Sequence, residues 1–180
     1  IVGNICNASP AGDTIGACML YNAILSIHGP TGKRELPLRS FFKGPGQSVL
    51  ELGEIVSEIR LPVPPEDHRG IYLKHGRNRK SDLSIIGASI IAKPDAEKKC
   101  GYSFEVALAS VAPVPLLVEG IDAVMDSEVI SPEEIMKAAI LAMEACKPID
   151  DVRSSARYRK MMVRNLVRRG LDQICAETFQ

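Results

Sequence analysis

The sequence predicts an α+β fold in which groups of antiparallel strands precede a helical C-terminal part. Short apolar runs separated by Gly- and Pro-rich turns fill most of the chain, which is typical of strands. Amphipathic patterns with helix-capping residues fill the remainder. The 180 residues are 46% apolar and 24% charged, the composition of a folded chain of one or two small domains.

The charge balance argues against a nucleic-acid-binding protein that relies on bulk positive charge. The 22 Lys and Arg equal the 22 Asp and Glu, so the formal net charge is zero. No apolar run approaches the ~18 residues of a membrane span, and no secretory signal is visible. The five cysteines are scattered without a Cys-x-x-Cys pair, so no metal site is predicted. Their odd number, without a disulfide pattern, favours the reducing cytoplasm.

The N-terminal segment is predicted to be a loop. Residues 1–14, IVGNICNASPAGDT, are crowded with Gly, Asn, Ser, Pro and Asp. Small residues allow backbone N–H groups to converge on an anion, and Asp13 is placed to accept hydrogen bonds from ribose or ribityl hydroxyls. The alternative, which the spacing alone favours, is an ordinary loop with Asp13 as a helix cap. Because the chain starts with Ile1-Val2-Gly3-Asn4 and no Met, we expect a segment that precedes it or lies on another chain.

A short helix and three strand-like runs follow. The expected elements are a helix at 14–22 with Asp13 or Thr14 as its cap, a hairpin of 23–28 with Lys33–Leu38, a Gly/Pro loop at 41–48, and a strand at Glu54–Leu61. Three prolines in Pro62-Val63-Pro64-Pro65 predict a stiff, extended connection. We therefore expect a domain at 1–62, a linker at 63–69 and a domain at 70–180.

The second domain is predicted to combine a three-stranded antiparallel sheet with packed helices. Its strand-like runs are 70–76, 83–93 and 103–118, the last of which is interrupted by Pro113 and Pro115. A helix begins at Ser131-Pro132-Glu133-Glu134, which joins a capping box to a proline in the first turn, and ends before Pro148. Ser154 or Ser155 caps the last helix, whose apolar stripe is Val163, Val167, Gly170 and Ile174.

Two basic clusters have competing interpretations. The residues Lys74, His75, Arg77, Arg79 and Lys80 surround a turn, which is either a solvated hairpin tip or a site for a phosphate or an acidic partner. Seven basic residues and no acidic residue lie between Arg153 and Arg169, which favours a solvated helix face over a docking face for a partner subunit. The three histidines lack metal-ligand spacing with the cysteines and are expected at the surface.

Several segments, in order along the chain, resemble the FAD-binding subunit of molybdenum hydroxylases, the family of xanthine, carbon monoxide and nicotinate dehydrogenases. Residues 1–13 resemble its Thr-Ile-Gly-Gly-Asn…Ser-Pro…Asp segment. Further similar segments are Asn22–Leu25, Gly32–Leu38, Phe41–Gly46, Leu52–Pro62, Ala109–Pro115, Asp151 and Ser155–Arg159. The resemblance implies that residues 1–62 are the second half of an FAD-binding domain and residues 70–180 the C-terminal domain of the flavoprotein.

The resemblance also implies a flavin site, with no residue that performs acid–base chemistry on an organic substrate. Val2, Gly3 and Asn4 would line the FAD pyrophosphate, Asp13 would bind a cofactor hydroxyl, Val56 would offer backbone groups to the adenine, and Lys74 would lie near the flavin. The turn Arg77–Asp82 corresponds to a loop beside the flavin in some relatives. Two departures stand out. Val2 replaces the first of the family's paired glycines, and the family's first phosphate loop, Ala-Gly-Gly-Thr, does not occur in the chain.

By this resemblance, FAD on the chain would take electrons from [2Fe–2S] clusters on an iron–sulfur subunit and pass them to NAD+ or another acceptor. A third subunit would hold molybdopterin and oxidise the substrate. The alternative is a non-catalytic structural or interaction subunit that binds no flavin. An unrelated phosphate-binding α+β domain would require the ordered matches to be a coincidence.

Overall fold

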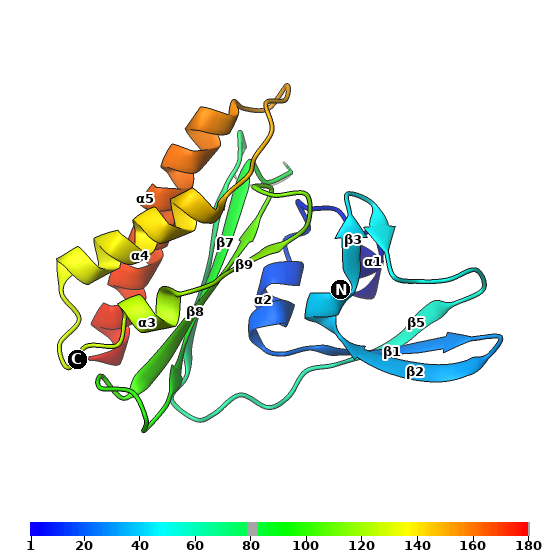
Figure 1. Cartoon of the computed structure of the whole chain (residues 1–180), viewed down its shortest axis with the longest axis horizontal. Helices are drawn as coiled ribbons and strands as arrows, with labels where there is room; N and C mark the ends of the chain where they lie inside the picture. The colour runs from blue at the N-terminus through cyan, green and yellow to red at the C-terminus, as the bar shows by residue number, and fades with distance from the viewer. Residues whose placement is uncertain (79–82, 180) are drawn as a thin grey trace.

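The computed structural model describes residues 1–78 and 83–179 of the chain. It confirms an α+β fold, with a three-stranded and a two-stranded sheet formed by the N-terminal residues and a four-stranded sheet formed by the C-terminal residues. The helix α2 (Ile15–Leu20) lies between the three-stranded and the four-stranded sheets (Figure 1).

The N-terminal sheet has three antiparallel strands in the order β2–β1–β5. They are β1 (Ile24–Gly29), β2 (Gly32–Pro37) and β5 (Ile55–Arg60). β1 and β2 form the predicted hairpin, whose turn contains Gly32 at φ +122°, a backbone conformation that favours glycine. A short 3₁₀ helix (Leu38–Ser40) and a small hairpin of β3 (Phe42–Gly44) and β4 (Gln47–Ser48) complete this part. Its core is aliphatic apart from one buried aromatic ring and includes Ile5, Ile15, Leu25, Ile27, Leu38 and Phe41.

The prediction that residues 1–14 are entirely loop is wrong for their first part. Val2–Cys6 form a short helix, α1. Gly3 and Asn4 have low helix propensity. However, one helical turn directs Ile5 into the apolar core, where it is fully buried. Tertiary burial thus outweighs the local preference of the sequence.

The C-terminal sheet has four antiparallel strands in the order β6–β7–β8–β9, one more than predicted. They are β6 (Arg69–His75), β7 (Ile86–Pro94), β8 (Tyr102–Ala109) and β9 (Leu116–Val118). The run 103–118 divides in two because the chain reverses at residues 110–115. Ser110 adopts φ +66° there, and prolines cannot continue a ladder of hydrogen bonds. β9 then returns along β8, with Leu116 opposite Leu108.

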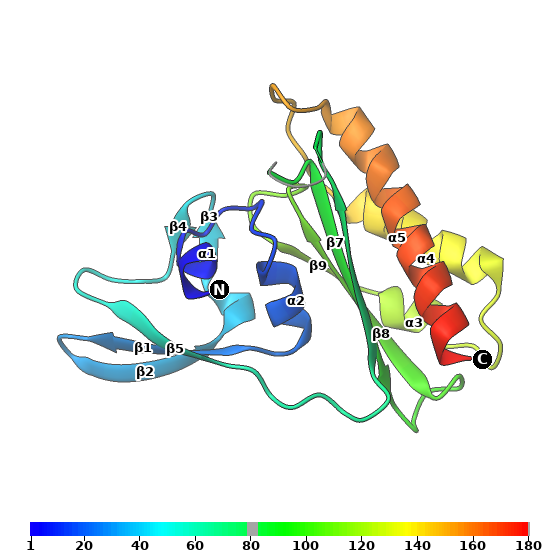
Figure 2. The ribbon, with the colours of Figure 1, turned by 180° about the vertical axis from the view of Figure 1, so that it is seen from behind.

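Helices cover both faces of the C-terminal sheet. The helices α4 (Pro132–Ala145) and α5 (Ala156–Thr178) lie against one face, and α2 lies against the other (Figure 2). The short helix α3 (Ile121–Val124) connects β9 to α4 and contacts both β8 and α4. Leu20 of α2 packs with Ile91 and Ala107 of the sheet. Residues 86–92 of β7 are therefore buried on both of their faces.

Both predicted helix starts are confirmed, and Ser155 rather than Ser154 is the cap of α5. Ser131 and Glu134 form a complete capping box at α4. The Ser155 hydroxyl accepts a hydrogen bond from the Tyr158 N–H at 3.2 Å. The predicted stripe of α5 is buried. A Cβ atom at Gly170 would collide with Ile90 Cδ1, so glycine allows this helix to approach the sheet closely.

Ile174→Ala is expected to lower the free energy of unfolding by about 2–5 kcal/mol, because it removes a fully buried side chain and leaves a cavity under α5. Met161→Ala on the outer side of the same helix is the matched control, expected to change stability by about 0.5 kcal/mol or less. Urea denaturation of both variants measures this difference. Equal losses would show that α5 does not use the Ile174 face for packing.

Candidate functional site

The first turn of α1 presents backbone N–H groups at the surface. Val2, Gly3 and Asn4 are exposed, and the N–H groups of the first residues of a helix have no acceptor within the helix. Among the described residues, and leaving aside its chain neighbours and the backbone of its own helix, nothing lies within 4 Å of the position that a Cβ atom of Gly3 would occupy. The surface of this turn can therefore be approached by an anionic group.

The side chain of Asn4 links this turn to the loop that carries Asp13. Asn4 Oδ1 accepts hydrogen bonds from Thr14 Oγ1 at 2.7 Å and from the Thr14 N–H at 3.4 Å. Thr14 immediately precedes α2, as predicted, but no side chain caps that helix. The polar side chains that sequence reasoning offered as caps are used instead for contacts around the site.

Asp13 and Lys74, both named from the sequence, are in direct contact. Asp13 Oδ2 accepts a hydrogen bond from Lys74 Nζ at 2.6 Å, and Asp13 Oδ1 accepts one from the Tyr72 hydroxyl at 2.6 Å. The side chain of Asp13 stays 40% exposed and that of Lys74 31% exposed. Because a carboxylate has about four lone-pair sites, Asp13 retains acceptor capacity and can be reached from solvent.

Tyr72 is the site residue that the sequence analysis missed. It stands two positions before Lys74 on β6, so the two side chains share one face of the strand. That alternation is the signal that would have found it. Burial and the neighbouring Asp13 raise the pKa of Tyr72 well above its usual range. Its hydroxyl therefore stays protonated and donates to Asp13.

Val56 lies on β5, at the outer edge of the N-terminal sheet. β5 pairs with β1 on one side, and within residues 1–78 and 83–179 its other edge has no strand neighbour. α1 packs against the same strand. The backbone groups along that edge are therefore available to a ligand near α1.

The other candidate residues contribute less. His75 Nε2 lies 3.0 Å from the Tyr158 hydroxyl on α5, so the ring is used in a contact between β6 and α5. Arg79, Lys80 and most of the predicted flavin-side turn Arg77–Asp82 lie outside the described residues. Within the described part of the chain, no group of His, Cys, Asp and Glu is arranged to hold a metal ion. None of the helices described here is long and apolar enough to cross a membrane.

Residues 71–174 match the family model described as the CO dehydrogenase flavoprotein C-terminal domain. The chain belongs to this flavoprotein family. Residues 1–64 match the model described as the FAD binding domain in molybdopterin dehydrogenase. The resemblance to FAD subunits of molybdenum hydroxylases is thereby confirmed.

Two individual relatives support this family assignment. The carbon monoxide dehydrogenase medium chain of Hydrogenophaga pseudoflava is 28% identical over 172 residues, which are 96% of this chain and 59% of that protein. The putative xanthine dehydrogenase FAD-binding subunit of Escherichia coli is 25% identical over 177 residues, 97% of this chain and 59% of that protein.

A solved structure is similar as well. The carbon monoxide dehydrogenase of Hydrogenophaga pseudoflava that lacks the Mo-pyranopterin moiety of its cofactor aligns with a TM-score of 0.89 at 28% identity. The alignment covers 98% of this chain and 60% of that one. The chain thus spans less than two thirds of the length of the relatives that it matches.

The residues present fit one side of a flavin dinucleotide. Open backbone donors at Val2, Gly3 and Asn4 suit a pyrophosphate. The exposed carboxylate of Asp13 suits a sugar or ribityl hydroxyl, and the ammonium of Lys74 suits an electron-rich ring. Val2 is 40% exposed. The first turn therefore stays accessible from solvent although a valine replaces the glycine of the family.

Tyr72→Phe is expected to reduce the loss of stability at alkaline pH. Because the folded protein holds the phenol proton more tightly than the unfolded chain, the stabilisation is complete below about pH 10 and falls as the pH rises above it. The free energy of unfolding, measured by urea titration at several alkaline pH values, tests this. Tyr102→Phe on β8 is the control and should retain the wild-type fall. An unchanged pH profile in Tyr72→Phe would contradict the raised pKa of Tyr72.

Proposed function

We propose that this chain forms part of an FAD-binding electron-transfer subunit in a multi-subunit molybdenum hydroxylase. One observation carries the proposal. The carboxylate of Asp13 and the ammonium of Lys74 meet beside the open first turn of α1, and they come from the two segments that match an FAD-binding domain and a flavoprotein C-terminal domain. An oxidoreductase subunit of this kind acts only within its complex.

Each residue has a distinct part in this proposal. The backbone N–H groups of Val2, Gly3 and Asn4 hold the pyrophosphate, and Asn4 also fixes the loop through Thr14. Asp13 accepts a hydrogen bond from a cofactor hydroxyl. The Tyr72 hydroxyl holds the Asp13 carboxylate in place by donating a hydrogen bond to it. Lys74 places a positive charge near the flavin, and the open edge of β5 at Val56 offers backbone groups to the adenine. FAD, when bound, supplies the redox chemistry.

The proposal includes the partners and the organisation of the chain. Electrons arrive from the [2Fe–2S] clusters of an iron–sulfur subunit and leave to NAD+ or another acceptor, and a molybdopterin subunit oxidises the substrate. Residues 1–62 and 70–180 act as the two domains, with 63–69 as the linker. All five cysteines are free thiols, which supports a cytoplasmic location.

The absorption spectrum of the native complex, isolated through a tag on this chain, tests the proposal. We expect the visible bands of an oxidised flavin together with the broader absorbance of iron–sulfur clusters. Dithionite should bleach both. A complex that contains the clusters but no flavin would overturn the proposal and leave the structural subunit as the function.

Lys74→Met is expected to make the midpoint potential of the bound flavin more negative, because it removes a positive charge that favours the reduced, anionic form. The expected shift is about 30 mV, which equals a tenfold change in equilibrium constant for a two-electron couple. Lys74→Arg keeps the charge and should retain most of the wild-type potential. Lys137→Met, on the exposed side of α4, is the control for loss of a lysine elsewhere. A spectroelectrochemical titration that finds Lys74→Met unchanged would exclude this role.

A further inference from the structure

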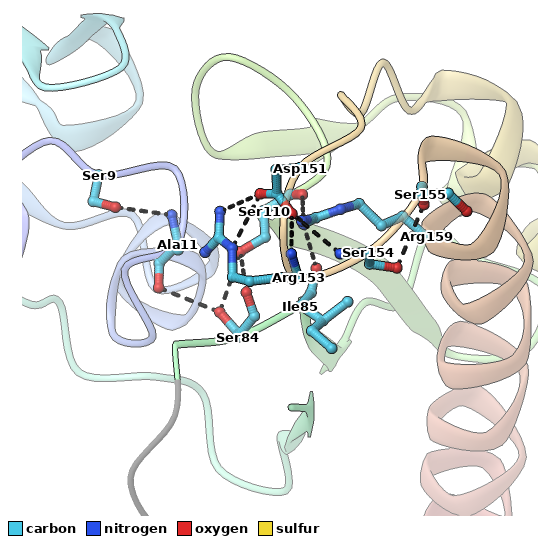
Figure 3. Close-up of polar contacts among 10 residues, drawn as sticks. All are labelled: Ser9, Ala11, Ser84, Ile85, Ser110, Asp151, Arg153, Ser154, Ser155 and Arg159. Atoms are coloured by element: carbon cyan, nitrogen blue, oxygen red, sulfur yellow. Dashed lines mark hydrogen bonds and ion pairs between the residues drawn. The ribbon is translucent and has the colours of Figure 1, made fainter. Parts of the chain in front are cut away.

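A buried arginine at the start of α5 joins three distant segments of the chain. Arg159 belongs to the stretch that the sequence predicts to be a solvated basic face, yet it is only 2% exposed. Its Nη1 donates hydrogen bonds to the backbone oxygens of Ile85 at 2.8 Å and Ser110 at 2.9 Å. Its Nη2 donates to Asp151 Oδ1 at 2.7 Å. Figure 3 shows these contacts converging between the end of β8 and the start of α5.

The same cluster holds the loop that leads to Asp13. The Ser110 N–H donates a hydrogen bond to the Pro10 oxygen at 2.7 Å. The Ser84 hydroxyl lies 3.3 Å from the Ala11 oxygen, to which it donates, and 3.2 Å from the Ser110 hydroxyl. Arg159 therefore fixes residues 85 and 110, and Ser110 holds Ser84 (Figure 3). Ser84 and Ser110 in turn hold residues 11 and 10.

Hydrogen bonds hold this loop where it borders a hollow on the cluster side. A cavity of about 420 Å³ lies there, lined in part by Pro10, Ala11, Pro113 and Arg159. Ser110 has φ +66°, an unfavourable backbone conformation for a residue with a side chain, and such residues persist only where neighbouring contacts hold them. The Arg159 bond to the Ser110 oxygen is one of those contacts.

The guanidinium is needed for this arrangement because one planar group reaches three acceptors on different segments. Arg153 and Arg159 hold the pKa of Asp151 well below its usual range, so the carboxylate remains charged and paired with both. A lysine would keep the charge and three N–H donors, but its single nitrogen cannot occupy the positions of both Nη1 and Nη2. It would therefore lose either the contacts to the two carbonyl oxygens or the contact to Asp151.

We propose that Arg159 is a positioning residue for the flavin site. It acts at a distance by holding residues 9–13, so that Asp13 stays against Tyr72 and Lys74 in the orientation that binds the cofactor. The effect on flavin binding rests on the proposed function. The structural step, in which Arg159 holds residues 9–13 in place, does not depend on the flavin.

Hydrogen exchange of the native complex tests the structural step. In Arg159→Lys, exchange of the Ser110 amide and of peptides covering residues 9–13 is expected to be about tenfold faster, because a buried hydrogen bond to a charged donor is lost. Arg168→Lys, an exposed position on the same helix, is the matched control and should exchange like wild type. Exchange unchanged in Arg159→Lys would overturn the proposal, whether or not the complex contains flavin.

A double-mutant cycle on flavin affinity tests the functional step. Arg159→Lys should weaken flavin binding about tenfold in the wild-type background and less than about twofold in an Asp13→Asn background, because both changes disable the same contact. Equal, additive losses would indicate general destabilisation and overturn the positioning role. Ser84→Ala keeps Arg159 and removes the hydroxyl contacts of Ser84 to Ala11 and Ser110, so it repeats the cycle if Arg159→Lys does not assemble. A wild-type complex without flavin would refute the proposed function but not the exchange result.

Discussion

The architecture depends on the need to bury both faces of β7. Seven consecutive residues of this strand, 86–92, are shielded from water. The helices α4 and α5 can cover one face only, so α2, which comes from the N-terminal part, covers the other. Because α2 must lie there, the loop that precedes it runs along the end of the sheet. This path brings Asp13 next to Tyr72 and Lys74 on β6. The burial of apolar side chains thus determines where the polar site lies.

The site and the Arg159 cluster fix one loop from two sides. Asp13 is held by side chains of β6, and residues 10 and 11 are held by the ends of β7 and β8. Neither set of contacts is local in sequence, since the partners are separated by about 60 to 100 residues. The first six residues of the chain join the same arrangement through Asn4 and Thr14. The loop that carries Asp13 is therefore held in place only when the N-terminal and C-terminal parts of the chain are packed together.

Local signals explain which parts of the fold the sequence could predict. The capping box of Ser131 and Glu134 and the glycine turn of the first hairpin are encoded within a few residues. By contrast, α1 forms because Ile5 finds a core built by residues far along the chain, and β9 forms because the chain can reverse at Ser110. Neither event is visible in a short window of sequence.

The candidate site shows the same difference between local sequence signals and long-range packing. Asp13 and Lys74 were identified individually, but their contact and the part of Tyr72 depend on how α2 packs across the sheet. Arg159 could not be separated from its basic neighbours, since only the three-dimensional packing shows that it points inward while Arg157 and Arg168 stay exposed.

The open edge of β5 also matters for how this polypeptide behaves. An unpaired strand edge is a template for another strand, and nearby Leu52 and Ile55 are 100% and 64% exposed. Two copies of the isolated chain can therefore pair edge to edge through β5, and the exposed aliphatic side chains would favour such pairs at high concentration. Self-association through this strand would be suppressed by any ligand or partner that covers the edge.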